Sequence, residues 1–174
     1  MSFTFAKDEH DVCLDRGFNV AVHTIANRLF PTGFDVSDNA PETLTDLKAH
    51  VRRTGRIVVA RKGSDRTIFG DPETNFAFRA WHDHCHLRDA NGRFNLSAPG
   101  HEFDQVGEFE TFQEQWKDLT KQYGSPKARW IDILHAEIMG QFAYHEIHGE
   151  FPHDQRAFVE AYLTYRSAAL FERW

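Results

Sequence analysis

The sequence predicts a mainly α-helical protein, a single-domain bundle of four to six helices with one small β-hairpin at about residues 56–70. Apolar residues recur at spacings of three and four along most of the chain, which is typical of amphipathic helices. A length of 174 residues fits one domain, because two would each be near the lower size limit. A composition of 41% hydrophobic and 26% charged residues excludes a wholly disordered chain.

Two helices are predicted before the hairpin. The first runs from about residue 9 to residue 30, and Pro31 ends its apolar face. The second is short, over about 41–53, with Leu44 and Leu47 facing inward.

The hairpin is predicted from two short apolar runs separated by turn residues. Residues 56–60 are rich in β-branched side chains, residues 63–65 are Gly-Ser-Asp, and residues 67–69 form the second run. A lone hairpin is marginally stable in water, so we expect it to pack against helices.

The next helix begins with a clear signal. Asp71 is a capping residue, Pro72 suits the first helical position, and Glu73 places an acid in the first turn. We expect this histidine-rich helix to reach Leu87 or Arg88.

Three more helices are predicted after it. One runs over about 101–123 and buries a stripe that includes Phe109 and Trp116. The next, over about 126–148, is apolar on nearly every side, which places it in the middle of the bundle. The last begins near Pro152.

The net charge and the composition argue against several classes of protein. The net charge of −6 argues against a protein that wraps duplex nucleic acid, which should be basic. No run of about 18 apolar residues exists, so no membrane span is expected, and the N-terminus lacks the apolar core of a signal peptide. Two cysteines cannot form a disulfide scaffold, and a cytoplasmic location is expected.

Eleven histidines in one small domain point to metal binding. His82 and His86 are four residues apart, so a helix brings both rings to one face, where they can share one metal ion. His84 lies between them and should point elsewhere. The alternative is a solvated, histidine-rich helix end.

Two carboxylates are candidates for the remaining ligands. Glu102 lies two turns before Phe109 and so extends the predicted buried stripe, although an acid there also suits a helix N-terminus. Glu137 lies in the most apolar helix, where a carboxylate needs a cation or a partner such as Arg79 or Arg88.

These ligands predict a metal-dependent hydrolase that uses a metal-activated water. Zinc is the first expectation, with iron or manganese as alternatives, and Asp83 or His101 would orient or deprotonate the water. The substrate, a small molecule or a peptide, is not defined by the sequence. Asp83 also gives His-Asp-x-x-His, one methylene short of the motif of zinc peptidases, in which a Glu is the base.

Three other functions remain open. The same ligands could serve a non-haem iron or di-metal redox protein. The pair His82-Asp83 invites comparison with HD phosphohydrolases acting on nucleotides, with His50 and Asp132 in the outer places. The third is a non-enzymatic interaction protein.

The stretch from Lys48 to Arg66 contains seven cations and is either a solvated surface or a patch for an anionic partner. Self-association through this stretch and an acidic helix face of opposite sign is a further alternative. The acids of that face are Glu108, Glu110, Glu114 and Asp118.

Two segments, residues 78–86 and 137–152, resemble parts of small helical proteins encoded by tailed bacteriophages. The resemblance implies no particular activity. It implies a viral accessory protein that acts in the host cytoplasm.

Overall fold

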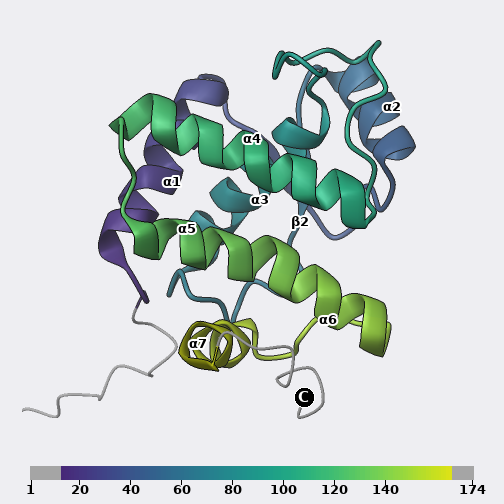
Figure 1. Ribbon diagram of the computed structural model, residues 1–174. Helices are drawn as coiled ribbons and strands as arrows, with labels where there is room; N and C mark the ends of the chain where they lie inside the picture. Colours follow the sequence, from purple (N-terminus) through teal and green to yellow (C-terminus); the bar gives the residue numbers. More distant parts are fainter. Residues whose placement is uncertain (1–12, 166–174) are drawn as a thin grey trace, which may run out of the picture.

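The computed structural model describes residues 13–165 and confirms a mainly helical fold with a minor β element (Figure 1). The predicted start of the first helix at residue 9 lies outside the described residues. The helices are α1 (Arg16–Leu29), α2 (Leu44–Thr54), α3 (Pro72–His86), α4 (Gln105–Tyr123), α5 (Ala128–His135), η2 (Ala136–Gly140), α6 (Gln141–His148) and α7 (Gln155–Tyr165). Since α5, the π-helical η2 and α6 follow one another without a break, they form one long helix, as predicted for residues 126–148.

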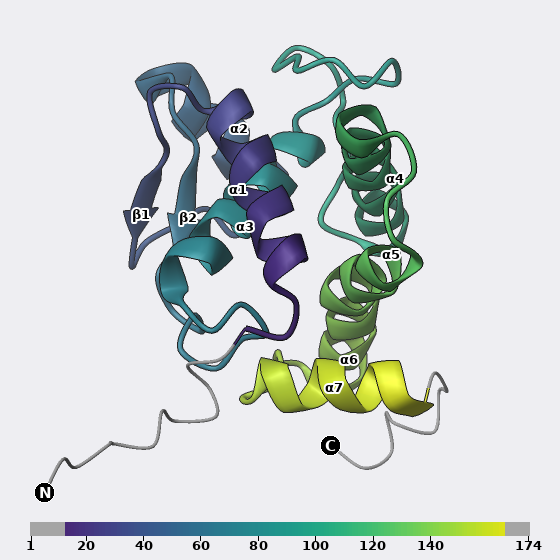
Figure 2. The ribbon, with the colours of Figure 1, turned by 90° about the vertical axis from the view of Figure 1, so that its left-hand side faces the viewer.

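Helix α3 is the centre of the arrangement. It packs against α1 on one side and α4 on the other. Figure 2 shows α4, α5 and α6 stacked on one side of the molecule, with α1, α2 and the strands opposite and α7 crossing below.

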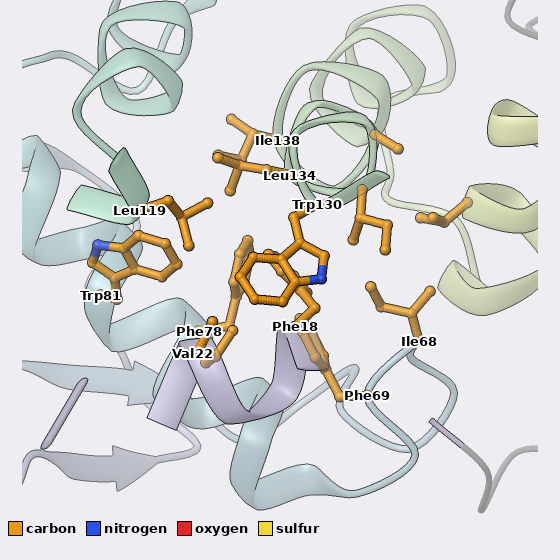
Figure 3. Packing of buried hydrophobic residues seen from close by; sticks show 14 of the residues in the cluster. Phe18, Val22, Ile68, Phe69, Phe78, Trp81, Leu119, Trp130, Leu134 and Ile138 are labelled. Carbon is orange, nitrogen blue, oxygen red and sulfur yellow. The ribbon is translucent and has the colours of Figure 1, made fainter. Parts of the chain in front are cut away.

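The core fills the space between these two halves (Figure 3). Its largest fully buried side chains include Phe18 of α1, Trp81 of α3 and Leu134 of α5. A second, smaller cluster lies between α2 and α3 around Leu44 and Leu47, which face inward as predicted.

Side-chain caps define where the helices begin. Asp15, Thr43, Asp71 and Asp104 each accept a hydrogen bond from the backbone N–H three residues later. Pro72 then occupies the start of α3, so the predicted signal for this helix is confirmed.

The β element is a parallel pair of strands, and the predicted hairpin is wrong. β2 (Val58–Ala60) pairs with β1 (Asp35–Ser37), in register from Asp35–Val58 to Ser37–Ala60. Helix α2 makes the crossover that parallel strands require. The second run predicted for the hairpin does not pair, because Ile68 and Phe69 turn into the main core.

The basic stretch holds nearby segments together. Lys48 donates to the carbonyls of Ala98 and Pro99, and Arg52 donates to that of Leu96. Arg56 pairs with Asp35 at 2.8 Å. These cations therefore fix the segment that joins α3 to α4 and the start of β1.

Two acids on the acidic face of α4, Glu114 and Asp118, are also committed to internal contacts. Glu114 and Asp118 are buried, and both accept from Arg88, at 3.1 and 2.6 Å. The indole N–H of Trp81 donates to Asp118 at 2.8 Å. Glu114 and Asp118 therefore face the interior, and of the acids on this face Glu110 is the one that remains exposed.

Removing Arg88 tests how much this buried network stabilises the fold. Arg88→Ala removes the buried cation that Glu114 and Asp118 share and leaves them, as cationic partners, only the more exposed Lys117 and Arg28, at 2.7 and 3.9 Å. This should lower the free energy of unfolding by about 3–5 kcal/mol. Urea denaturation followed by circular dichroism measures the loss. Arg61→Ala is the matched control, since Arg61 pairs with Asp38 at an exposed site, and it should cost less than about 1 kcal/mol. Equal effects of the two substitutions would contradict this account.

Candidate metal centre

His82 and His86 lie one above the other on α3, as the spacing predicts. Their Nε2 atoms are 3.0 Å apart. His84 points away from them and packs against the rings of Phe30 and Phe94. The two-histidine arrangement is therefore confirmed.

The third member of the group is Glu108 of α4. Its Oε2 lies 3.2 Å from Nε2 of His82, and its Oε1 lies 3.5 Å from Nε2 of His86. Two ligands bound at 2.0–2.1 Å in tetrahedral geometry are about 3.3 Å apart. The three side chains are therefore placed so that they could hold one metal ion.

Both histidines are oriented by hydrogen bonds at their other nitrogen. Nδ1 of His82 donates to Oε1 of the buried Gln115 at 3.0 Å. Nδ1 of His86 donates to the backbone carbonyl of His101 at 2.8 Å. Because both acceptors hold a proton on Nδ1, each ring would bind a metal ion through Nε2, once the proton that Nε2 of His82 shares with Glu108 has left. Such partners are typical of metal-binding histidines.

Two glycines make this geometry possible, because each lets its own backbone lie very close to another backbone segment. A Cβ on Gly100, which has φ +73°, would lie 2.6 Å from the backbone oxygen of His86. A Cβ on Gly107 would lie 1.8 Å from the backbone oxygen of Glu102. The segment before α4 can therefore press against α3 and deliver the His101 carbonyl to His86.

Aromatic rings surround the group and limit its contact with water. Phe78 stacks on His82 and Phe103 meets the edge of His86, with centroids 6.5 and 4.5 Å apart. The His86 side chain is 1% exposed, whereas those of His82 and Glu108 are 19% and 13% exposed. The group is therefore largely dry but keeps a side that solvent can reach.

The electrostatics of the three groups are tightly linked. Burial opposes charge on His82, but the adjacent Glu108 carboxylate outweighs it and raises the pKa of His82 to about 9. Burial likewise opposes ionisation of Glu108, yet both imidazoles hold its pKa well below the ordinary value. Burial lowers the pKa of His86. A cation that enters must displace a proton, so metal binding here is coupled to proton release.

The other predicted site residues lie outside this group. Glu102 precedes α4 and is exposed, so it is not on the buried face where it was expected. The His101 ring turns to Glu110, at 2.7 Å, and reaches His86 only through its backbone. Asp83 is partly buried beside His82, and burial raises its pKa to about 7.

Glu137 is buried, as predicted, but is not one of the three grouped side chains. It lies in η2, and its Oε2 accepts from Nε2 of Gln141 at 3.0 Å. Burial raises its pKa to about 8, although the nearby charge of Arg79 opposes this shift. Its side chain is therefore a neutral acid at neutral pH.

The sequence interpretation missed Glu108 and Gln115 because it turned α4 the wrong way. It took Phe109 and Trp116 as buried, yet they are 46% and 44% exposed. The face that meets α3 instead carries polar side chains. The spacing of seven between Glu108 and Gln115 was visible in the sequence and could have indicated a shared polar face.

No protein-family model matches the chain, and no match is found among the curated proteins or the solved structures. Among the described residues, no helix is both long and apolar enough to cross a membrane. Functional inference therefore depends on the geometry of the site.

Metal binding by matched variants tests the ligand set. Glu108→Gln should reduce the affinity for Zn²⁺ or Co²⁺ at least about 100-fold, because it removes a charged ligand. Glu137→Gln and Glu102→Gln should bind as the unchanged protein does. Isothermal titration and the absorption of Co²⁺ measure this. Full binding by Glu108→Gln, or loss of binding in Glu137→Gln alone, would contradict the assignment.

The pH dependence of stability tests the burial of Glu137. The unfolded chain releases this proton near the ordinary pKa of a glutamate, whereas the folded protein keeps it to about pH 8. Ionisation of the unfolded state therefore costs stability as the pH rises from about 5 to about 8. Relative to the unchanged protein, Glu137→Gln should gain at least about 2 kcal/mol over this range. A pH-independent difference in denaturation would contradict a raised pKa.

Proposed function

We propose that the protein is a metal-dependent hydrolase whose ion is held by His82, His86 and Glu108. The observation that carries this proposal is that the Nε2 atoms of His82 and His86 both face the carboxylate of Glu108. The Nδ1 atom of each ring is held by a hydrogen bond on its other side. Three protein ligands leave a coordination position for water, which distinguishes catalytic zinc sites from closed structural ones. The remaining exposure of His82 and Glu108 gives a substrate access to that position.

Each residue around the proposed ion would have a separate role in hydrolysis, set by its position. Bound zinc would lower the pKa of a coordinated water to about 7 and polarise an ester or amide carbonyl or a phosphoryl group. Gln115 and the His101 carbonyl keep both imidazoles in the ligand tautomer. We assign Asp83 the role of accepting the proton of the attacking water, because it is close enough to His82 and Glu108 for their charges to influence its pKa.

A second candidate function is oxygen chemistry at non-haem iron. Two histidines and one carboxylate also form the facial set that holds Fe(II) in oxygenases and leaves several positions open. Iron with an oxygen-dependent optical change in protein purified without an affinity tag would favour this function. Zinc, or manganese without redox activity, would favour the hydrolase.

The HD phosphohydrolase alternative receives no support from the geometry. His50 lines a surface hollow with Arg53, whereas Asp132 lines another with His135. Within residues 13–165, neither belongs to the His82 group.

Hydrolysis by zinc-loaded protein tests the proposal. We expect turnover of 4-nitrophenyl acetate or bis(4-nitrophenyl) phosphate that rises with pH through about 7 and disappears in Glu108→Gln. Asp83→Asn should retain zinc but lose about 10²–10⁴-fold in rate, because it removes the proton acceptor. Rates equal to those of free zinc for both esters, or no zinc binding, would refute a hydrolase.

A further inference from the structure

A hollow of about 270 Å³ lies between α5 and α7. Helix α7 crosses below α5 and η2 and contacts both (Figure 2). Among the described residues, those that line the hollow are Asp132 and His135 of α5 and Tyr162 and Leu163 of α7. The hollow therefore offers a ligand one carboxylate, two rings and one aliphatic side chain.

The two rings of the hollow are held by contacts with their neighbours. The hydroxyl of Tyr162 lies 3.0 Å from Nδ1 of His135, and the two ring centroids are 5.9 Å apart. Phe112 of α4 meets the His135 ring edge-on, with centroids 5.3 Å apart. A Cβ on Gly140 would lie 3.1 Å from the Tyr162 ring, so this glycine lets the ring pack directly on the backbone. Rings that are fixed in advance reduce the entropic cost of binding a ligand.

The backbone beside the hollow is irregular as well. The π-helical turn η2 begins directly after His135 and ends at Gly140. Such turns are rare, and those that lie inside α-helices occur frequently at functional sites. Here the turn joins the two residues on which the position of Tyr162 depends. This observation is independent of the side chains that line the hollow.

The charge of these side chains favours a cation. Asp132 lies one turn before His135, close enough for its charge to act on the pKa of that histidine. Burial outweighs this effect and lowers the pKa of His135, so its imidazole is neutral at neutral pH. Burial also raises the pKa of the Tyr162 phenol, which therefore stays neutral. A neutral aromatic ring presents a negative face to a cation, and the Asp132 carboxylate adds a full negative charge.

The number of hydrogen-bond acceptors favours a quaternary ammonium group over a primary one. A primary ammonium group has three N–H donors, and these four side chains offer few acceptors beside the carboxylate. A quaternary ammonium group has no N–H to satisfy, and its methyl groups suit contact with rings and with Leu163. The hollow is smaller than the pockets of about 300–1,000 Å³ that hold drug-sized molecules, so the ligand should be small.

We propose that the hollow between α5 and α7 binds a small quaternary ammonium ion, with Asp132 opposite its charge and the rings of His135 and Tyr162 against its methyl groups. This site goes beyond the proposed hydrolase. It is independent of the metal centre, because its described lining residues include none of the three proposed metal ligands.

Titration of the full chain with matched ligands tests the proposal. Choline should bind with a millimolar dissociation constant in isothermal titration, and the ring protons of Tyr162 should shift in NMR spectra. The neutral analogue 3,3-dimethyl-1-butanol has the same shape, and ethanolamine has the same charge without the methyl groups. Each should bind at least about tenfold more weakly than choline. No binding of choline, or equal binding of the neutral analogue, overturns the proposal.

Matched variants locate the site. Asp132→Asn and Tyr162→Leu should each weaken choline binding at least about tenfold, whereas Tyr162→Phe keeps the ring and should retain most of the affinity. Asp38→Asn is the control, because Asp38 is an exposed carboxylate that pairs with Arg61, and it should change nothing. Circular dichroism verifies that each variant is folded. Unchanged affinity in Asp132→Asn overturns the assignment.

Two further measurements separate this proposal from others. Glu108→Gln should bind choline as the unchanged protein does, so failure of the metal centre and failure of this site are distinguishable. Phosphatidylcholine vesicles carry the same ammonium group on a lipid surface. Binding to these vesicles without binding to free choline would overturn the proposal of a small-molecule site.

Discussion

The contact between α3 and α4 is the constraint on which the rest of the structure depends, because it buries charged and polar groups as well as apolar ones. At one end, Arg88 lies between Glu114 and Asp118. At the other, two histidines of α3 face Glu108 of α4. Buried charges tolerate little displacement, since each loses its partner if the helices slide. The pairing therefore fixes the rotation of α4 and the positions of the possible metal ligands together.

This constraint explains why the segment between the two helices has an irregular path that is nonetheless well fixed. His101 exchanges two backbone-linked hydrogen bonds with His86, through its N–H and its carbonyl. Lys48 and Arg52 of α2 hold the carbonyls of the same segment. Gly100 permits the approach, because any larger residue would meet the His86 backbone. Lys48 and Arg52 were candidates for a surface patch, but they support the position of His86 indirectly, through the segment that contains His101.

Local sequence signals were enough to predict the helices, whereas contacts between residues far apart in the sequence could not be predicted. Asp71 and Pro72 start α3 through contacts within four residues, so the sequence alone could reveal them. The partner of β2 is a three-residue strand with one apolar side chain, which no local pattern identifies. His82 and His86 were found because helical spacing is enough to bring them together. Glu108 required the rotation of α4 about its axis, which tertiary contacts decide.

The rotation of α4 about its axis was predicted wrongly because this helix differs from an ordinary surface helix. An ordinary surface helix buries its large apolar residues and exposes its charges. Helix α4 keeps Phe112 and Leu119 inside but also turns Glu108, Glu114, Gln115 and Asp118 inward, while Phe109 and Trp116 face out. Inward carboxylates are costly unless cations meet them. Arg88 meets two of the carboxylates, and the two histidines offer Glu108 a proton or a metal ion to share.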